Sequence, residues 1–303
     1  MALHIRVECS AVYEFIGSFM LFVQRKWIHN VDDGLEWVRD VEQQVPDSFL
    51  FKISELQNYS IHEFDMLFAA SLELDHAHHV SLFLEQLQTV SEEEWLSLFV
   101  HTGLPFDKEH VVKLKQDYIP LLQEWYEHYF RWSVPEWEPI LIQDATEKTR
   151  LFNKMSPVDL IELATNGVVF ENSDNVREVV LAPMWHYRPI INTCTFTNTT
   201  LVLYATESEE EDDVPPKSLK RMIHALSSDI RLKMLRYLSH ESVTFSELVS
   251  YIQLEESTVQ QHLVILRAAG YIRTYWNGKV ERISLRQEGI ADLSAFLENY
   301  VQS

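Results

Sequence analysis

The stretch from Glu256 to Ile272, ESTVQQHLVILRAAGYI, decides the fold of the region around it. Val259, Leu263 and Leu266 recur at helical spacing and form one apolar face, and Gly270 predicts the end of the helix before a strand. Short hydroxyl and amide side chains stand at the start of this helix. Such side chains at the N-terminal end are typical of a helix that enters the major groove of DNA.

The neighbouring residues predict a winged helix-turn-helix around this helix. Thr244 and Glu247 fit a capping box, and Asn277-Gly278 favours a two-residue hairpin turn between strands. The expected elements are helices at 217–226, 229–238, from 244 and from 256, strands at 271–275 and 280–285, and a last amphipathic helix after 289. Four helices, a hairpin and a closing helix are the order of a winged domain here.

Several stretches resemble the ArsR-type family of bacterial repressors. Residues 223–235, IHALSSDIRLKML, are similar to the opening of the family's winged domain, and Ser257–Leu263 with Leu266–Gly270 are similar to its recognition helix. The resemblance covers residues 219–300, and the whole chain is similar to a subgroup in which a long N-terminal domain precedes the winged helix. It implies a homodimer that binds an imperfect palindrome in double-stranded DNA, usually as a repressor, with the first and last helices of the winged domain at the dimer interface.

The candidate base-reading residues lie in the first turns of the predicted recognition helix. Thr258, Gln260 and Gln261 are expected at base edges, because glutamine can pair with adenine and a threonine methyl can meet the thymine methyl. Ser257 is expected at a phosphate or as the helix cap. His262 matches a family histidine and has two interpretations, a phosphate contact or a packing residue.

The candidate phosphate contacts are cations: Arg267, Arg273, Lys279 and Arg282. Lys279 stands at the expected wing tip, near the minor groove. The alternative for each is a solvated surface charge. Glu255 and Glu256 suit the dipole at the helix start but would repel any phosphate that they faced.

Length and charge predict two domains with different partners. The chain has 303 residues and a formal net charge of −21, whereas residues 217–303 alone hold 11 Lys+Arg against 9 Asp+Glu. We therefore predict an acidic domain at 1–206, a linker at 207–216 and the DNA-binding domain at 217–303. The acidic residues of the linker precede two prolines and indicate either a plain extended linker or an intramolecular mimic of DNA.

The first domain is predicted to be α+β, mainly α with a small antiparallel sheet. Ser10, Ser91 and Ser156 are expected helix caps, with Glu94 completing a capping box. The expected helices lie near 33–44, 61–72, 78–89, 91–101, 108–131 and 135–153, and the expected strands near 178–182, 190–196 and 200–204. The alternating run at 4–8 is a candidate for the same sheet.

Two clusters in the first domain leave alternatives open. Asp75, His76, His78 and His79 have metal-ligand side chains, but a polar helix junction with no bound metal is the favoured interpretation. The crowded aromatic residues indicate either a ligand pocket, with Arg131 or Arg188 binding an anion, or a core and dimer interface: Trp125, Tyr126, Tyr129, Phe130, Trp132 and Trp137. Cys9 and Cys194 are expected to be two thiols, or a redox pair if the first strand joins the final sheet.

The remaining sequence patterns argue against other classes of protein. Phosphate-binding glycine loops, nucleophile motifs and the cysteines or histidines of known ArsR metal sites are missing, so we expect no enzyme, no cofactor and no metal. No apolar run has membrane-spanning length, and few cysteines indicate a reducing cytoplasm. A small-molecule effector in the first domain is a further expectation. The alternative function is an interaction protein whose winged helix and acidic domain contact proteins without sequence-specific DNA binding.

Overall fold

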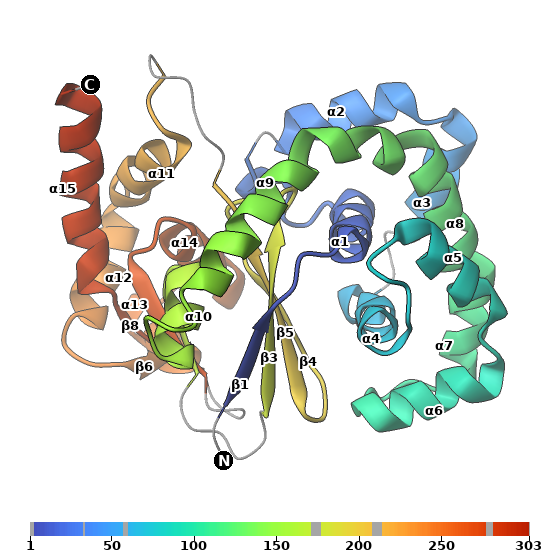
Figure 1. Ribbon diagram of the computed structural model, residues 1–303. Coiled ribbons are helices and arrows are strands. Elements are labelled where there is room, and N and C mark those ends of the chain that lie inside the picture. The colour runs from blue at the N-terminus through green and yellow to red at the C-terminus, as the bar shows by residue number, and fades with distance from the viewer. Residues whose placement is uncertain are drawn as a thin grey trace. The chain divides into compact units, whose positions relative to one another are not determined.

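The computed structural model describes residues 3–32, 34–56, 60–170, 177–207, 214–276 and 281–302. Its chain forms two compact units (Figure 1). Unit 1 comprises Met1–Thr149, Val176–Arg188 and Asn192–Thr206, and unit 2 comprises Arg150–Asn175, Pro189–Ile191 and Glu207–Ser303. The structure is mainly α with small sheets, as predicted. Within the described ranges, no helix has the length and apolar character needed to cross a membrane.

Unit 1 is built from helices whose predicted caps are confirmed. Ser10 caps α1 through its hydroxyl, and Ser91 with Glu94 forms the capping box of α6. The long helical stretch contains π-helical turns at Leu114–Tyr118 and Tyr126–Phe130, and Pro120 lies in the first turn of α8. The helices are α1 (Ala11–Gln24), α2 (Gly34–Gln44), α3 (Asp47–Leu56), α4 (Asp65–Glu73), α5 (Val80–Thr89), α6 (Glu92–Thr102), α7 (Lys108–Lys113), α8 (Ile119–Trp125) and α9 (Arg131–Arg150), which ends in unit 2.

The sheet of unit 1 has the strand order β1-β3-β5-β4. Its strands are β1 (His4–Val7), β3 (Glu178–Met184), β4 (Asn192–Thr195) and β5 (Thr199–Ala205). The prediction of an antiparallel sheet was wrong: β1 runs parallel to β3 and β3 parallel to β5, and only the β4–β5 hairpin is antiparallel. The chain leaves β3 and returns as β4 on the far side of β5, so β3 and β5 keep the same direction.

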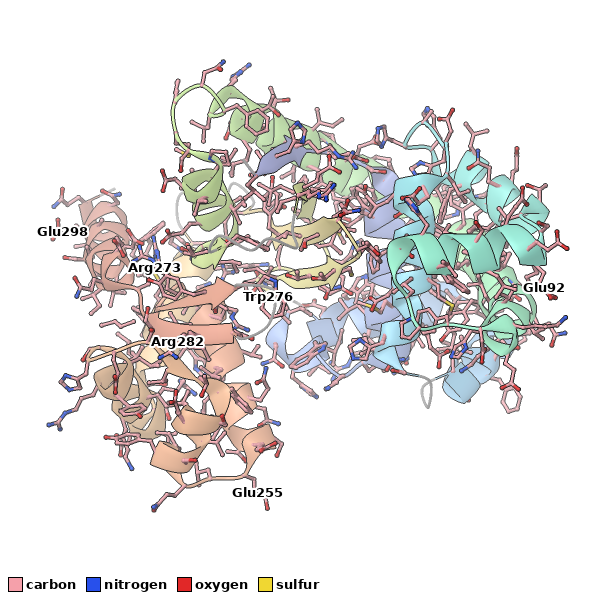
Figure 2. The ribbon with its side chains drawn as sticks, turned by 90° about the horizontal axis from the view of Figure 1, so that it is seen from below. Glu92, Glu255, Arg273, Trp276, Arg282 and Glu298 are labelled. Carbon is pink, nitrogen blue, oxygen red and sulfur yellow. The ribbon has the colours of Figure 1, made fainter. Side chains whose placement is uncertain are left out.

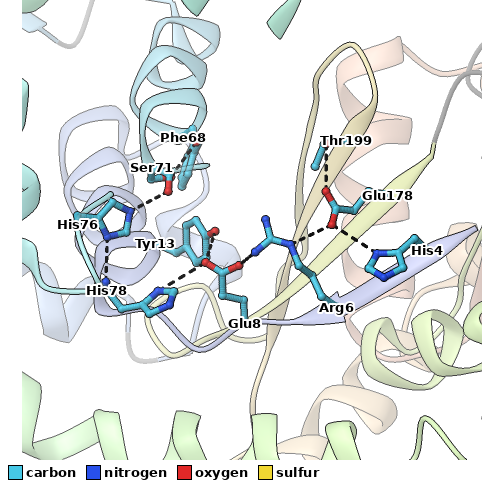
Figure 3. Close-up of polar contacts among 10 residues, drawn as sticks. All are labelled: His4, Arg6, Glu8, Tyr13, Phe68, Ser71, His76, His78, Glu178 and Thr199. Carbon is cyan, nitrogen blue, oxygen red and sulfur yellow. Dashed lines mark hydrogen bonds and ion pairs between the residues drawn. The ribbon is translucent and has the colours of Figure 1, made fainter. Parts of the chain in front are cut away.

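The first strand does join this sheet, at the edge opposite β4. Cys9 follows β1 and Cys194 lies in β4, so two strands separate them and both are free thiols. Charged side chains surround β1: Arg6 forms ion pairs with Glu8 and Glu178, and His78 lies 3.5 Å from Glu8 (Figure 3). The separation of the two cysteines agrees with the interpretation of two separate thiols and not with a redox pair.

The core of unit 1 is aromatic and encloses the fully buried carboxylate of Glu14. Helix α1 is buried from Val12 to Val23. Glu14 within it accepts hydrogen bonds from the backbone N–H groups of Trp185 (2.8 Å) and His186 (2.9 Å), and it also pairs with the His186 ring. Because the full burial of a carboxylate is costly without such donors, this network fixes α1 against the loop that follows β3.

Unit 2 contains the winged helix-turn-helix and an upstream segment. Its winged part has α11 (Lys217–Leu226), α12 (Asp229–Leu238), β6 (Val243–Thr244), α13 (Phe245–Ile252), α14 (Glu256–Ala268), β7 (Ile272–Trp276), β8 (Glu281–Leu285) and α15 (Gln287–Gln302). The predicted element order is thus found. The wing turn at 277–280 and the acidic stretch 208–213 lie outside the described residues.

The upstream segment of unit 2 consists of α10 (Pro157–Thr165) and β2 (Val168–Phe170), which we call the α10–β2 segment. Strand β2 pairs in parallel with β7, so the second sheet has the order β2-β7-β8-β6. The sequence placed these residues in the first domain, 1–206. The structure groups Arg150–Asn175 with the winged elements instead.

Candidate DNA-binding surface

Helices α13 and α14 form the helix-turn-helix. The Thr244 hydroxyl and the Glu247 side chain complete the predicted capping box of α13. Gln253 ends this helix in the left-handed conformation, at φ 60°, and the chain turns into α14 within a few residues. The buried side chains of Val259 and Leu263 fix α14 on the core of the winged domain.

The first turns of α14 carry the predicted base-reading residues on an accessible surface. Ser257 and Gln261 are exposed, and Thr258 and Gln260 are half-buried beside them. Residues four apart share a helix face, so Ser257 and Gln261 point to the same side. The structure therefore brings these hydroxyl and amide groups together at the end of the helix where groove-reading side chains are expected.

The charge at this helix end is negative. Glu255 precedes α14 without capping it through its side chain, and both Glu255 and Glu256 are exposed. Figure 2 shows Glu255 at the outer end of this part of unit 2. A carboxylate here is stabilised by the helix dipole but repels a phosphate that approaches the same N–H groups. Base contacts rather than phosphate contacts are therefore favoured at the first turn of α14.

Each predicted phosphate-binding arginine that the structure describes is engaged within unit 2. Arg267 bonds the Thr274 hydroxyl and pairs with Glu281. Arg282 donates to the hydroxyl and to the carbonyl oxygen of Ser242.

Arg273 pairs with Glu162 of α10 and Glu288 of α15, and Figure 2 shows it beside the strands of the wing. Burial alone would lower the pKa of Arg273, but the Glu162 carboxylate raises it above the ordinary arginine value, with a contribution from Glu288. Arg273 therefore serves within the fold as the partner of two carboxylates. Lys279 lies outside the described residues.

The surroundings of His262 favour its neutral form. Burial, with a contribution from the Arg231 charge, lowers the pKa of His262. Its Nδ1 atom is buried without a hydrogen-bond partner in the described part of the chain. Arg231 in turn donates to the carbonyl oxygens of His224 and Ala225, which lie in the last turn of α11. These contacts favour the packing interpretation of His262.

Sequence reasoning missed a cationic and aromatic group on α12 and α13. Tyr237 and Tyr251 stack with ring centroids 3.9 Å apart, and Lys233 lies over Tyr251 at 5.3 Å. Lys233 and Arg236 are exposed, and no carboxylate of the described residues forms an ion pair with either. The helical spacing of the two cations on α12 is the signal that could have indicated this surface.

Helix α15 leaves an apolar surface open. Gly289 is its one buried residue within the described part of the helix. Its exposed apolar side chains are Ile290 (56%), Phe296 (42%), Leu297 (44%) and Val301 (73%), and Ile223 of the neighbouring α11 is 50% exposed. Such a stripe on a helix is normally covered by another protein surface.

The metal-like cluster of unit 1 has a structural explanation. The Nε2 atom of His76 bonds the Ser71 carbonyl at 2.8 Å, and its Nδ1 atom accepts from the His78 backbone N–H at 3.1 Å. Both ring nitrogens are thus occupied (Figure 3). Within the described ranges, no three His, Cys, Asp or Glu side chains are placed to hold a metal ion.

The aromatic cluster is mostly core. Trp125, Trp137, Tyr129 and Phe130 are buried against one another, whereas Trp132 is exposed. Arg188 lies over the Trp185 ring at 3.1 Å and is itself buried. These contacts favour the core interpretation over the ligand pocket.

Comparison with a protein-family model agrees with this geometry. Residues 228–274 match the family model described as bacterial regulatory protein, arsR family. Among solved structures, the chain is similar to an ArsR family transcriptional regulator (26% identity, 28% of this chain and 94% of that chain, TM-score 0.26). It is also similar to NolR from Sinorhizobium fredii (25% identity, 28% of this chain and 85% of that chain, TM-score 0.24). No curated protein matches the sequence.

The winged fold and the family match together define the class of unit 2, a DNA-binding domain of a transcription regulator. More particularly, residues 228–274, from the start of α12 into β7, match the model of the ArsR-family domain.

Proposed function

We propose that the protein is a sequence-specific DNA-binding transcription regulator that acts in the cytoplasm as a homodimeric repressor. The observation that carries this proposal is the accessible set of Ser257, Thr258, Gln260 and Gln261 at the start of α14, within a domain of the ArsR family. A non-enzymatic role follows from the same domain. An effector, if one acts, would act on unit 1.

Dimerisation is proposed through α15 and α11. The exposed stripe of Ile290, Phe296, Leu297 and Val301 matches the surface that a second copy would cover. Two-fold symmetry would place paired α14 helices in successive major grooves, one helical turn apart, and the target would then be an imperfect palindrome. Phe296→Asp should yield monomers in analytical ultracentrifugation and abolish tight DNA binding, whereas Glu298→Gln on the same helix should preserve both.

Selection of DNA fragments by the purified full chain tests sequence preference. Binding to the selected site should fall steeply with salt and exceed binding to random DNA. Gln260→Ala with Gln261→Ala should lose about 1–3 kcal/mol of discrimination for each lost base pairing, with the dimer intact. Gln287→Ala on α15 is the matched control and should retain the preference.

One observation favours the alternative, an interaction protein without sequence-specific DNA binding. Glu255 and Glu256 are exposed at the helix start, and the described arginine candidates are paired with groups of the same unit. Binding no stronger to selected DNA than to random DNA would remove the regulator proposal and favour this alternative. The sign of regulation is read from a reporter gene behind the selected site, where a repressor lowers expression.

A further inference from the structure

The α10–β2 segment completes the wing sheet by strand addition. Val168, Val169 and Phe170 align with Thr274, Tyr275 and Trp276, and the Thr274 N–H donates to the Gly167 carbonyl at 2.8 Å. Without β2, strand β7 would be the edge of the sheet, because β8 occupies its other side. The free N–H and C=O groups of such an edge would be open to water or to other strands.

Two glycines allow the α10–β2 segment to approach the winged elements closely. Gly167 has φ +130°, and a Cβ there would lie 2.6 Å from the Ile272 carbonyl oxygen. Gly270 has φ +70°, and a Cβ there would lie 2.3 Å from the side-chain nitrogen of Asn166. Both positions need a backbone conformation that L side chains rarely adopt. The end of α10 and the end of α14 are thus shaped to fit each other.

An ion pair also joins the α10–β2 segment to the winged elements. Glu162 of α10 pairs with Arg273 of β7, at about a quarter exposure for both side chains. Arg273 also pairs with Glu288 at 3.2 Å, so one guanidinium joins α10, the wing and the start of α15. An exposed ion pair contributes little, but a partly buried pair of a pre-organised arginine fixes geometry.

The α10–β2 segment is covalently linked to unit 1 on both sides. Residues of unit 1 precede the α10–β2 segment through α9, and β3 of unit 1 follows it. A change at either flank acts through covalent continuity on a strand only three residues long. Short pairings of this kind open at low free-energy cost compared with whole domains.

We propose that the α10–β2 segment is a regulatory clasp: docked on β7, it holds the wing in the geometry that binds DNA, and its release weakens binding. The proposal rests on the proposed DNA-binding function. Release leaves β7 as an open edge and frees Arg273 from Glu162, so the wing samples geometries that do not fit the groove. The apparent affinity then falls in proportion to the fraction of docked protein.

Gly167→Ala in the full chain tests the clasp, because the added Cβ meets the Ile272 carbonyl. We expect hydrogen exchange to accelerate at the Thr274 amide while the amides of buried α14 residues stay protected. Affinity for the selected DNA site should fall roughly tenfold if about a tenth of the protein remains docked. Glu162→Ala should have a smaller effect in the same direction, and Asp159→Asn, an exposed acid on the same helix, should change neither readout.

A reversible crosslink separates release of the clasp from general damage. Val169 and Tyr275 are register partners on neighbouring strands, whose spacing suits a disulfide. In a Gly167→Ala, Val169→Cys, Tyr275→Cys chain, oxidation should restore the affinity and reduction should remove it again. A chain with Val169→Cys alone controls for Cys9 and Cys194.

The outcomes distinguish the two proposals. If the unaltered chain shows no sequence preference, the proposed function fails, while exchange at Thr274 still reports whether the clasp opens. If the unaltered chain binds its site and Gly167→Ala accelerates exchange without weakening binding, the clasp proposal is overturned and the regulator proposal stands. Failure of oxidation to restore affinity would equally overturn the clasp.

Discussion

Both sheets of this protein gain an edge strand by parallel pairing, but the strands that receive them differ in burial. Each receives a strand from far upstream that pairs in parallel: β1 with β3 in unit 1, and β2 with β7 in unit 2. The partner of β1 is a strand buried from Val179 to Met184, whereas β7 has half-buried residues along the wing. β1 is itself partly exposed but borders a buried strand, whereas β2 borders a strand that reaches the surface.

An added strand can therefore be a fixed part of the core or a part that can detach, depending on how deeply the receiving strand is buried. β3 is a central strand whose loss would expose the aromatic core. β7 packs Ile272 on the core of the winged domain, on the face of the strand that also carries the buried Thr274. Perturbing each sheet in turn tests this contrast.

The largest effect is expected in the sheet of unit 1. Leu181 is fully buried in β3, so Leu181→Ala should lower the free energy of unfolding of unit 1 by about 2–5 kcal/mol. Urea denaturation followed by tryptophan fluorescence measures it. Leu163→Ala, on the exposed side of α10, should change stability by less than about 0.5 kcal/mol. Equal losses for the two variants would contradict the contrast.

A second effect is expected where α14 ends. Gly270→Ala forces a left-handed alanine against Asn166 and should cost about 1–3 kcal/mol of the stability of unit 2, measured by thermal unfolding. In an Asn166→Ala background the same substitution should cost less, because the added Cβ loses its closest neighbour. If the background made no difference, backbone strain alone would explain the loss, and the fit between α10 and α14 would carry no energy.

A third effect depends on pH and concerns unit 1. Burial lowers the pKa of His76, so the unfolded state takes up a proton that the folded site resists. The stability from neutral His76 is therefore fully present above the ordinary histidine pKa of about 6.5 and is lost as pH falls below it. His76→Gln should flatten this dependence in urea titrations between about pH 7.5 and 5.5. An unchanged slope in the His76→Gln variant would contradict this effect of burial.

The smallest effect is expected from the charges around β1. Arg6 is 39% exposed and pairs with Glu8 and Glu178, so Arg6→Met should cost less than about 1 kcal/mol. Arg25→Met, which removes the pair with Glu42, is the comparison for an ion pair away from the sheet. A loss as large as that of Leu181→Ala would mean that charge, and not burial, holds β1.

Local chemistry made much of the fold predictable. The capping boxes at Ser91 and Thr244 and the proline-led start of α10 depend on residues within a few positions of one another, and all are present. The apolar spacing of Val259, Leu263 and Leu266 placed the recognition helix. Such patterns are visible in a single sequence because the interacting groups are neighbours in it.

The features that escaped prediction depend on distant partners. Three residues, Val168–Phe170, carry no signal that they pair with β7 and not with the nearby strands of unit 1. Arg273 and Arg267 look like surface cations until Glu162 and Glu281 are placed beside them. Strand direction in the first sheet was likewise decided by the path of the chain between β3 and β4 and not by the strand residues.

During synthesis, one strand of each parallel pair is made long before its partner. The ribosome delivers β1 long before β3, and β2 roughly a hundred residues before β7, because chains grow from the N-terminus. Each early strand must stay unpaired, or shielded by its own unit, while its partner is made. Distant pairings of this kind slow folding and expose strand edges meanwhile. We expect the nascent chain to depend on chaperones until β7 has emerged.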